Sequence, residues 1–360
     1  MDSNMYAVIM AGGVGSRFWP VSTRNHPKQF IDILGTGKSL IRQTYERFLK
    51  LVPAENIYVV TNKDYFDLVK KHIPELADAQ ILGEPSAKNT APCVAYATHR
   101  IVKENSNANI IVAPSDHLIL DEQEFLRIVK EGLDYTAQND SLLCIGIKPH
   151  RPDTGYGYIQ FKEEEAAPSI HPVKTFTEKP DLALAQTFLD SGDFLWNAGI
   201  FIWNAQSIIS AFQKLLPEMD VLFADLEPMM GTDKEAEALV NAYQLCTNIS
   251  IDYGILEKAE NVTVYPGDFG WSDLGTWASL YDVYPKDAEN NAVNGKRVQL
   301  YDSNSNMVCV PDDKLVVLNG IQDLIVVDSA KALLISRKDR EQDVKQIVTD
   351  TKLKYGEKYS

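Results

Sequence analysis

The chain has 360 residues, of which 45% are hydrophobic and 24% are charged, as in ordinary globular proteins. A net charge of −15, with no basic cluster to offset it, excludes general nucleic-acid binding. No apolar run approaches the ~20 residues that span a membrane, and the N-terminus lacks a signal-peptide pattern, so we expect a cytoplasmic protein with no membrane partner.

Strand-like and helical segments alternate through the first 150 residues. Apolar, β-prone runs predict strands over 6–10, 57–60, 79–82, 109–113 and 142–147, and other segments predict helices from about 40 and over 64–72 and 90–103. This alternation is typical of an α/β fold with a Rossmann-like, mostly parallel sheet and helices on both faces. In such sheets, ligands bind beyond the carboxyl ends of the strands.

The pattern changes twice further along the chain. From about residue 150 we expect strands over 155–161 and 173–177, followed by helices over 182–189, 205–215 and 233–245. After residue 285, short apolar strands recur over 298–301, 307–310, 315–318, 324–327 and 332–335, and a closing helix is expected over 340–354. The chain is therefore expected to divide into a domain over 1–284 and a small β-rich module over 285–360. Four cysteines without a CxxC pair predict reduced, mostly buried thiols.

The most informative motif is AGGVGSRFWP at 11–20, closed by PKQ at 27–29. It follows the first predicted strand, and its glycines Gly12, Gly13 and Gly15 leave backbone N–H groups open to a phosphate. Arg17 supplies a planar fork for phosphate oxygens, and Lys28 supplies a compact charge. Together they outline a polyphosphate site. The alternative is a tight strand–helix turn with two surface cations.

Two familiar phosphate-binding motifs do not fit this spacing. A dinucleotide fingerprint counted from Gly13 requires a glycine at position 18, which is Phe18. A Walker motif ending at Gly37-Lys38-Ser39 requires a glycine at position 32, which is Asp32. Residues 35–39 are therefore interpreted as a plain turn before a helix.

The glycine motif with PKQ resembles the GGxGxRxxP signature of the sugar-1-phosphate nucleotidyltransferases, in the form found in mannose-1-phosphate guanylyltransferases. Further matches follow in order to about residue 285: GEPSAKNTAP at 83–92, PSDH at 114–117, FTEKP at 176–180, WNAGIF at 196–201, SIDYG at 250–254 and GWSDLGTW at 270–277. The resemblance implies a catalytic domain over 1–284 and a left-handed β-helix-like C-terminal module. Longer relatives carry a fused cupin-type isomerase domain, which we do not expect here.

The resemblance also implies a reaction. GMP passes from GTP to α-D-mannose 1-phosphate, which yields GDP-mannose and pyrophosphate by in-line attack at the α-phosphorus. The attacking phosphate is already an anion, so no general base is required, and catalysis rests on positioning and charge neutralisation. The resemblance implies that GTP and mannose 1-phosphate are the substrates, that Mg²⁺ is the cofactor and that the enzyme acts in GDP-mannose biosynthesis. It is also compatible with a homodimer.

Four residues are assigned to catalysis through the resemblance. Arg17 is expected on the β- and γ-phosphates, and Lys28 on the α-phosphate and the sugar phosphate. Asp116 and Asp273 are expected to hold Mg²⁺ through oxygen ligands. A helix N-cap is the alternative role of Asp116. His117 is expected to be structural, because Mg²⁺ prefers oxygen to imidazole.

The remaining candidates bind the base and the sugar. The nucleotide-side candidates are Gly12, Gly13, Gly15, Glu84, Asn89 and Thr90. A carboxylate at Glu84 would accept hydrogen bonds from guanine N1–H and N2–H₂. The alternative is that Glu84 is a solvated loop glutamate. On the sugar-phosphate side are Gly157, Glu178, Lys179 and Asn197. Neighbours in a strand point to opposite faces, so Glu178 and Lys179 require a bend before Pro180 to share a pocket. Asn197 could lie in a plain turn, and Asp252 could orient the sugar pocket or cap a helix.

Three other functions stay open at this point. One is the same chemistry on another hexose 1-phosphate or with another nucleoside triphosphate. Another is a non-catalytic regulatory subunit that binds GDP-mannose, and the third is a sugar-binding scaffold. The presence of Arg17, Lys28 and both aspartates weighs against the last two.

Overall fold

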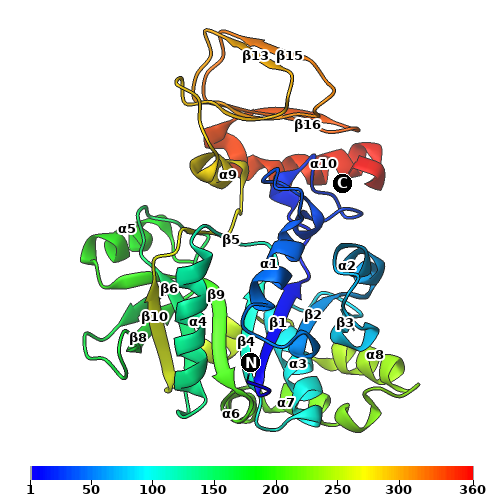
Figure 1. Ribbon diagram of the computed structural model, residues 1–360, viewed down its shortest axis with the longest axis vertical. Coiled ribbons are helices and arrows are strands. Elements are labelled where there is room, and N and C mark those ends of the chain that lie inside the picture. Colours follow the sequence, from blue (N-terminus) through cyan, green and yellow to red (C-terminus); the bar gives the residue numbers. More distant parts are fainter. Residues whose placement is uncertain (1, 360) are drawn as a thin grey trace. The chain divides into compact units, whose positions relative to one another are not determined.

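The computed structural model describes residues 2–359 and divides into two compact units (Figure 1). The first unit runs to Gly12 and continues through Thr44–Ser115 and Ile119–Trp271. The second contains Gly13–Gln43, Asp116–Leu118 and the chain from Ser272 onward. These units are not continuous stretches of sequence, so they do not test the predicted domain boundary after residue 284, which stays a prediction.

The first unit is built on a nine-stranded sheet with the order β3-β2-β1-β4-β9-β6-β10-β8-β7. Its strands are β1 (Met5–Ala11), β2 (Ile57–Asn62), β3 (Ile81–Glu84), β4 (Asn109–Pro114), β6 (Leu142–Ile147), β7 (Tyr158–Phe161), β8 (His171–Thr177), β9 (Phe194–Asn204) and β10 (Val262–Gly267). Its helices are α2 (Phe66–His72), α3 (Thr90–Glu104), α4 (Glu122–Thr136), α5 (Leu182–Ser191), α6 (Ala205–Leu215), α7 (Pro217–Ala224) and α8 (Glu235–Leu245). Helix α1 (Leu40–Phe48) begins where the turn over 35–39 predicts.

The sheet is mixed, so the prediction of a mostly parallel sheet was wrong. Strands β3, β2, β1 and β4 are parallel, and so are β6 and β10. Strand β9 separates these two groups and runs antiparallel to β4, β6 and β7. Strands β7 and β8 are consecutive and pair as a hairpin, which is necessarily antiparallel. Strands β9 and β10 and helix α4 were not predicted at all.

Side-chain alternation explains why helices cover both faces of the sheet. On one face, Tyr6 and Val8 of β1 and Phe201 and Trp203 of β9 belong to one buried cluster with residues of α3 and α6. On the other face, Ile202 points to α4, where a Cβ on Gly132 would lie 2.7 Å from its Cδ1 atom. The carboxyl ends of β1 and β3 therefore sit on a rigid, two-sided core.

The second unit contains a coil of short strands. Parallel pairing of β12 (Ala292–Asn294), β14 (Met307–Cys309) and β16 (Leu324–Asp328) forms one sheet, which β17 (Leu333–Arg337) closes in the antiparallel direction. Strands β13 (Val298–Tyr301) and β15 (Val316–Asn319) form a second parallel sheet. Because the chain alternates between the two sheets, the module is β-helix-like, as predicted. Its left hand stays a prediction. Helices α9 (Trp277–Val283) and α10 (Val344–Tyr355) complete the unit.

Two further strands are only two residues long. They are β5 (Leu118–Ile119) and β11 (Trp271–Ser272), which pair with each other. None of the helices formed by residues 2–359 has the length and apolar character that crossing a membrane requires. All four cysteines are free thiols, and three of them are buried.

Candidate active site

The glycine loop of the second unit packs tightly against Lys28. Gly15 has a φ of 72°, and a Cβ at this position would lie 2.5 Å from the Cβ of Lys28. Both facts require glycine. The backbone N–H of Lys28 donates to the carbonyl of Val14 over 3.1 Å, and the Ser22 hydroxyl donates to the same carbonyl over 2.5 Å. The loop therefore holds the Lys28 side chain along its own backbone.

The Lys28 side chain is buried, so it is not a surface cation. The residue is 3% exposed. Its Nζ donates to Asp116 Oδ2 over 2.8 Å and to the backbone carbonyl of Asp273 over 2.7 Å, and it lies 5.4 Å from the centre of the Phe18 ring. One ammonium thus gathers two aspartates that are far apart in the sequence. That they meet could not be derived from spacing.

The two aspartates are held in different ways. Burial raises the pKa of Asp116, but the charges of Lys28 and His117 and the hydrogen bond from Lys28 outweigh it, so the net shift is downward and the carboxylate stays ionised. The carboxylate of Asp273 accepts from the N–H of Gly275 over 2.9 Å. Next to it, Leu274 is fully buried with a φ of 44°, a strained conformation for a branched residue. Strain of this kind persists where the surrounding structure fixes it.

Arg17 has an unsatisfied donor. It follows Gly15 in the short 3₁₀ helix Ser16–Phe18. Its Nε is buried and has no hydrogen-bond partner among residues 2–359. A buried donor without a partner costs free energy, so a ligand oxygen at this position would be stabilising.

The oxygen donors suit a hard cation. Mg²⁺ characteristically takes one or two carboxylates and completes its shell with waters and substrate phosphates. Asp116 and Asp273 match that requirement in number and in chemistry. Within residues 2–359, no group of three or more histidine, cysteine, aspartate or glutamate side chains is arranged to hold a metal ion. A metal here would therefore depend on phosphate oxygens for part of its shell.

In the first unit, Glu84 is buried beside Gly12. It ends β3, it is 7% exposed, and a Cβ on Gly12 would lie 3.5 Å from its Oε2. Its Oε1 accepts from the hydroxyl of Tyr243 over 2.9 Å. Burial raises the pKa of Glu84 from 4.5 to about 7, against the smaller opposite effect of the Tyr243 hydrogen bond. A solvated loop glutamate is therefore excluded.

Asn89 and Thr90 form the start of α3. Asn89 is exposed and has a φ of 70°, and its side chain accepts from the N–H of Thr90 over 2.9 Å. The hydroxyl of Thr90 accepts from the N–H of Ile251 over 2.8 Å. The structure thus gives both side chains intramolecular partners, and the exposed one lies on strained backbone.

The four sugar-side candidates include three that lie together in the first unit. A Cβ on Gly157 would lie 2.4 Å from Glu178 Oε2 and 3.4 Å from the Cβ of Asn197, so glycine leaves room for the carboxylate. The N–H of Asn197 donates to the carbonyl of Gly157 over 2.8 Å. Asn197 lies in β9 and not in a plain turn, although the strand is irregular there, with a φ of 67° at Gly199.

Lys179 joins this group through a bend. Strand β8 ends at Thr177, and Lys179 has a φ of 49°, so the chain turns before Pro180 as the sequence requires. The ammonium of Lys179 pairs with the carboxylate of Glu178. The Glu178 side chain is 5% exposed and that of Lys179 is 57% exposed, so the carboxylate is fixed while the ammonium remains accessible.

Two residues of these clusters had little or no sequence signal. Tyr243 lies in α8, 159 positions from its partner Glu84, and nothing in the local sequence marks it. Asp252 was left open between two roles, and it accepts from Nδ2 of Asn197 over 2.8 Å. Burial, followed by the repulsion of Glu178, raises the pKa of Asp252 to about 6.

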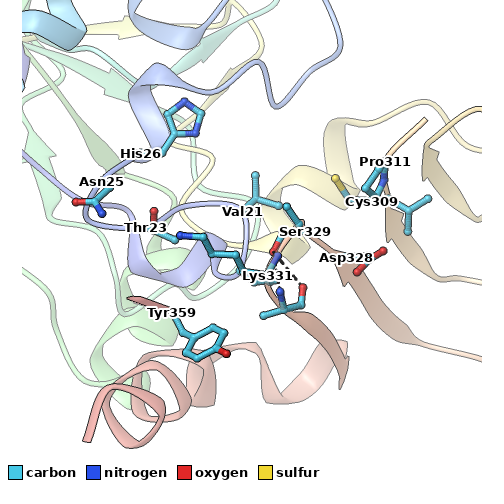
Figure 2. A pocket seen from close by; sticks show the side chains of 14 residues that line it. Val21, Thr23, Asn25, His26, Cys309, Pro311, Asp328, Ser329, Lys331 and Tyr359 are labelled. Carbon is cyan, nitrogen blue, oxygen red and sulfur yellow. Dashed lines mark hydrogen bonds between the residues drawn. The ribbon is translucent and has the colours of Figure 1, made fainter. Parts of the chain in front are cut away.

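A separate hollow of about 450 Å³ lies in the second unit (Figure 2). It is lined by the turn over 20–26, by residues 309–311 and 328–332, and by Tyr359. None of the predicted site residues lines it. The candidate active site is therefore defined by the polar clusters above and not by this hollow.

Two family profiles match the chain. The family described as "Nucleotidyl transferase" matches residues 6–290, and the "MannoseP isomerase/GMP-like beta-helix domain" matches residues 295–350. The first match covers most of the chain, so the chain belongs to the nucleotidyltransferase class.

Three named proteins resemble nearly the whole chain. The alginate biosynthesis protein AlgA of Pseudomonas aeruginosa is 35% identical in an alignment that covers 96% of this chain and 72% of the relative. A mannose-1-phosphate guanylyltransferase of Salmonella montevideo is 35% identical in an alignment that covers 96% of this chain and 74% of the relative. A crystal structure from Thermus thermophilus, described as a mannose-1-phosphate geranyltransferase, has a TM-score of 0.86 at 31% identity and covers 97% of this chain and 99% of its own.

The chain therefore belongs to the mannose-1-phosphate guanylyltransferase family of sugar-1-phosphate nucleotidyltransferases.

Proposed function

We propose that this enzyme transfers GMP from GTP to α-D-mannose 1-phosphate and releases GDP-mannose and pyrophosphate. The observation that carries the proposal is the buried Lys28 ammonium, which lies against the glycine loop and contacts both Asp116 and Asp273. Membership of the guanylyltransferase family supports the choice of substrates.

The phosphate chemistry needs cations and backbone donors rather than a nucleophilic side chain. The sugar phosphate is itself the nucleophile, so catalysis depends on alignment and on neutralising charge at the phosphates. Arg17 would bind the β- and γ-phosphates, where its unsatisfied Nε finds an acceptor. Lys28 would stabilise charge at the α-phosphate and the incoming phosphate. The N–H groups of Gly12, Gly13 and Gly15 would line the phosphate chain.

The carboxylates would hold Mg²⁺. Asp116 is ionised beside Lys28, and Asp273 supplies a second carboxylate and a carbonyl contact to the same ammonium. The ion, when bound, would offset the negative charge of the triphosphate. The task of Lys28 in this arrangement is to keep both aspartates gathered before the substrate arrives.

The base and the sugar would be read by the first unit. Glu84 in its ionised form would accept from guanine N1–H and N2–H₂, while adenine turns a lone pair toward it and lacks the second donor. Asn89 and Thr90 begin the helix that follows this loop. On the sugar side, Glu178 would accept from neighbouring hydroxyls, Asn197 would complete the pocket beside Gly157, and the accessible Lys179 would reach the sugar's phosphate.

A single assay tests the proposal. Pyrophosphate release is measured for four nucleoside triphosphates combined with several hexose 1-phosphates, with and without Mg²⁺. We expect the highest kcat/KM for GTP with mannose 1-phosphate, and dependence on the metal. If another pair gave the highest kcat/KM, the proposed substrates would be wrong. If the protein bound GDP-mannose but turned over no pair, it would be a regulatory subunit and not an enzyme.

A further inference from the structure

One short segment of the first unit is bonded to the base-side loop along its whole length. This segment runs from Tyr243, in the last turns of α8, to Tyr253, and we call it the brace. Four hydrogen bonds join it to residues 84–91: Tyr243 Oη to Glu84 Oε1 (2.9 Å), Lys88 Nζ to the Cys246 carbonyl (3.2 Å), Ala91 N to the Ile249 carbonyl (3.2 Å) and Ile251 N to Thr90 Oγ1 (2.8 Å). The loop that contains the base-side candidates therefore does not hold its shape alone.

The far end of the brace reaches the sugar-side cluster. Oδ1 of Asp252 accepts from Nδ2 of Asn197 over 2.8 Å, and the hydroxyl of Tyr253 donates to the carbonyl of Glu178 over 3.4 Å. The other side of the Asn197 amide is also fixed, because its Oδ1 accepts from the N–H of Gly199 over 3.0 Å. These two bonds set the amide so that one Nδ2 hydrogen is left to donate to a ligand hydroxyl.

The brace is stiff enough to connect its two ends. Ile251 is fully buried, and the N–H of Tyr253 donates to Ser250 Oγ over 3.2 Å. From Asp252 to Leu256 the chain forms a π-helical turn, a rare element that often marks functional sites. A Cβ on Gly254 would lie 2.8 Å from Leu216 Cδ1, so the turn packs closely against the Leu216 side chain.

We propose that the brace positions both ligand clusters at once, with Tyr243 holding the base-reading carboxylate of Glu84 and Asp252 holding the donor face of Asn197. Tyr243 and Asp252 are positioning residues in this proposal. It rests on the proposed function, because that function assigns the base to Glu84 and the sugar to Asn197. When a single hydrogen bond at one end is lost, the remaining bonds still attach both clusters to the brace, so the two ends support each other.

The first test separates the two ends. Tyr243→Phe removes one hydroxyl and is expected to lower the GTP-over-ATP preference about tenfold, with the KM for mannose 1-phosphate changed less than twofold. Asp252→Ala is expected to raise that KM about tenfold at nearly constant kcat, and Asp252→Asn, which keeps an acceptor oxygen for Asn197, to change it no more than about threefold. Equal losses in the alanine and asparagine variants, chiefly in kcat, would show that the Asp252 charge acts on the substrate and would overturn the positioning role.

A matched control accounts for loss of stability. Tyr58 is also buried and also donates from its hydroxyl to a glutamate, Glu104, over 2.9 Å. Tyr58→Phe should lower the melting temperature about as much as Tyr243→Phe and leave the GTP-over-ATP preference unchanged. If both variants change that preference alike, the effect is general loosening and the proposal fails.

The double variant tests whether the support is shared. In Tyr243→Phe/Asp252→Ala, a shared brace loses its side-chain bonds to Glu84 and Asn197, so the loss in kcat/KM should exceed the product of the single losses by about tenfold. Losses that simply multiply would mean two independent supports and would overturn the brace. The parent is first assayed on the full substrate panel. Failure of the proposed function appears in the parent, whereas failure of the brace appears only in the variants, whichever substrate pair is used.

Discussion

Replacing Glu84 by glutamine should stabilise the protein at neutral and alkaline pH. Burial raises the pKa of Glu84 to about 7 from its ordinary value of 4.5. A carboxyl group with a raised pKa in the folded state binds protons more tightly there than in the unfolded chain. Its contribution to stability is therefore fully present below pH 4.5 and is lost as the pH rises through about 7.

The size of the effect follows from that difference. A tenfold change in proton affinity corresponds to about 1.4 kcal/mol, so an ionised Glu84 costs the folded state on the order of 3 kcal/mol above pH 7. Glutamine is neutral at every pH and its Oε1 can still accept from Tyr243, so Glu84→Gln removes the cost and keeps the hydrogen bond. We expect the variant to gain up to about 3 kcal/mol of unfolding free energy at pH 8 and close to nothing at pH 4.5.

Paired unfolding curves between pH 4.5 and 8 measure this. The difference between the parent and Glu84→Gln should grow through the interval from 5 to 7 and then level off. Glu104→Gln is the matched control, because Glu104 also accepts from a tyrosine but is exposed. A stability difference that is constant with pH, or equal in the control, would refute the assignment of a buried carboxyl that ionises near neutrality.

Activity should change in the opposite direction. The proposed function requires a carboxylate acceptor for guanine, so Glu84→Gln should weaken GTP use more than ATP use. A site built around hydrogen bonds discriminates by on the order of 10²–10⁴, and this ratio should shrink. An unchanged ratio of kcat/KM values for GTP and ATP would place base recognition elsewhere, most directly on backbone groups between Pro85 and Thr90.

Three further predictions concern the phosphate side. Lys28→Ala should lower kcat by on the order of 10²–10³, as for loss of one oxyanion donor, and parent-like turnover would remove Lys28 from the site. Asp116→Asn and Asp273→Asn should each raise the Mg²⁺ concentration needed for half-maximal rate, and the double variant should be little worse than the worse single one; multiplicative losses would mean that they act separately. A Cβ on Gly13 has nothing within 4 Å, so Gly13→Ala should fold normally and lose phosphate affinity, whereas Gly15→Ala should lose stability because of its φ of 72° and its contact with Lys28. Calorimetry measures the stability of the two variants and GTP titration measures their affinity. Normal GTP affinity in Gly13→Ala would exclude the glycine loop as a phosphate-binding site.

The elements that sequence predicted well are those with a strong local pattern. Strand β1 and helices α3 and α6 fall within a residue or two of their predicted bounds, because apolar runs and helical periodicity are local properties. Strand direction is not local. Strand β9 lies between β4 and β6, which both precede it by many residues in the sequence. Its antiparallel direction depends on pairing with these two strands. Its own sequence is interrupted by Asn197 and Gly199, which hid it as a strand.

The site shows the same division between local and long-range information. Glycine, arginine and lysine in one short motif predicted phosphate chemistry, because the residue types themselves carry it. That Lys28 is buried, and that its ammonium gathers Asp116 and Asp273, depends on contacts across 88 and 245 positions. The motif itself named Lys28, whereas the two aspartates were paired only through a family resemblance, and sequence could not show that the three residues meet.

Tyr243 shows why supporting residues escape such reasoning. A tyrosine in a helix is ordinarily a core residue, and its buried ring here fits that role as well. Only the 2.9 Å bond from its hydroxyl to Glu84 distinguishes it. The carboxylate it holds costs stability when ionised, so a selection for stability alone would favour glutamine at position 84. A costly buried acid that keeps a dedicated hydrogen-bond donor is best explained by a requirement on the ligand, and the opposite effects expected of Glu84→Gln on stability and on base choice follow from that single requirement.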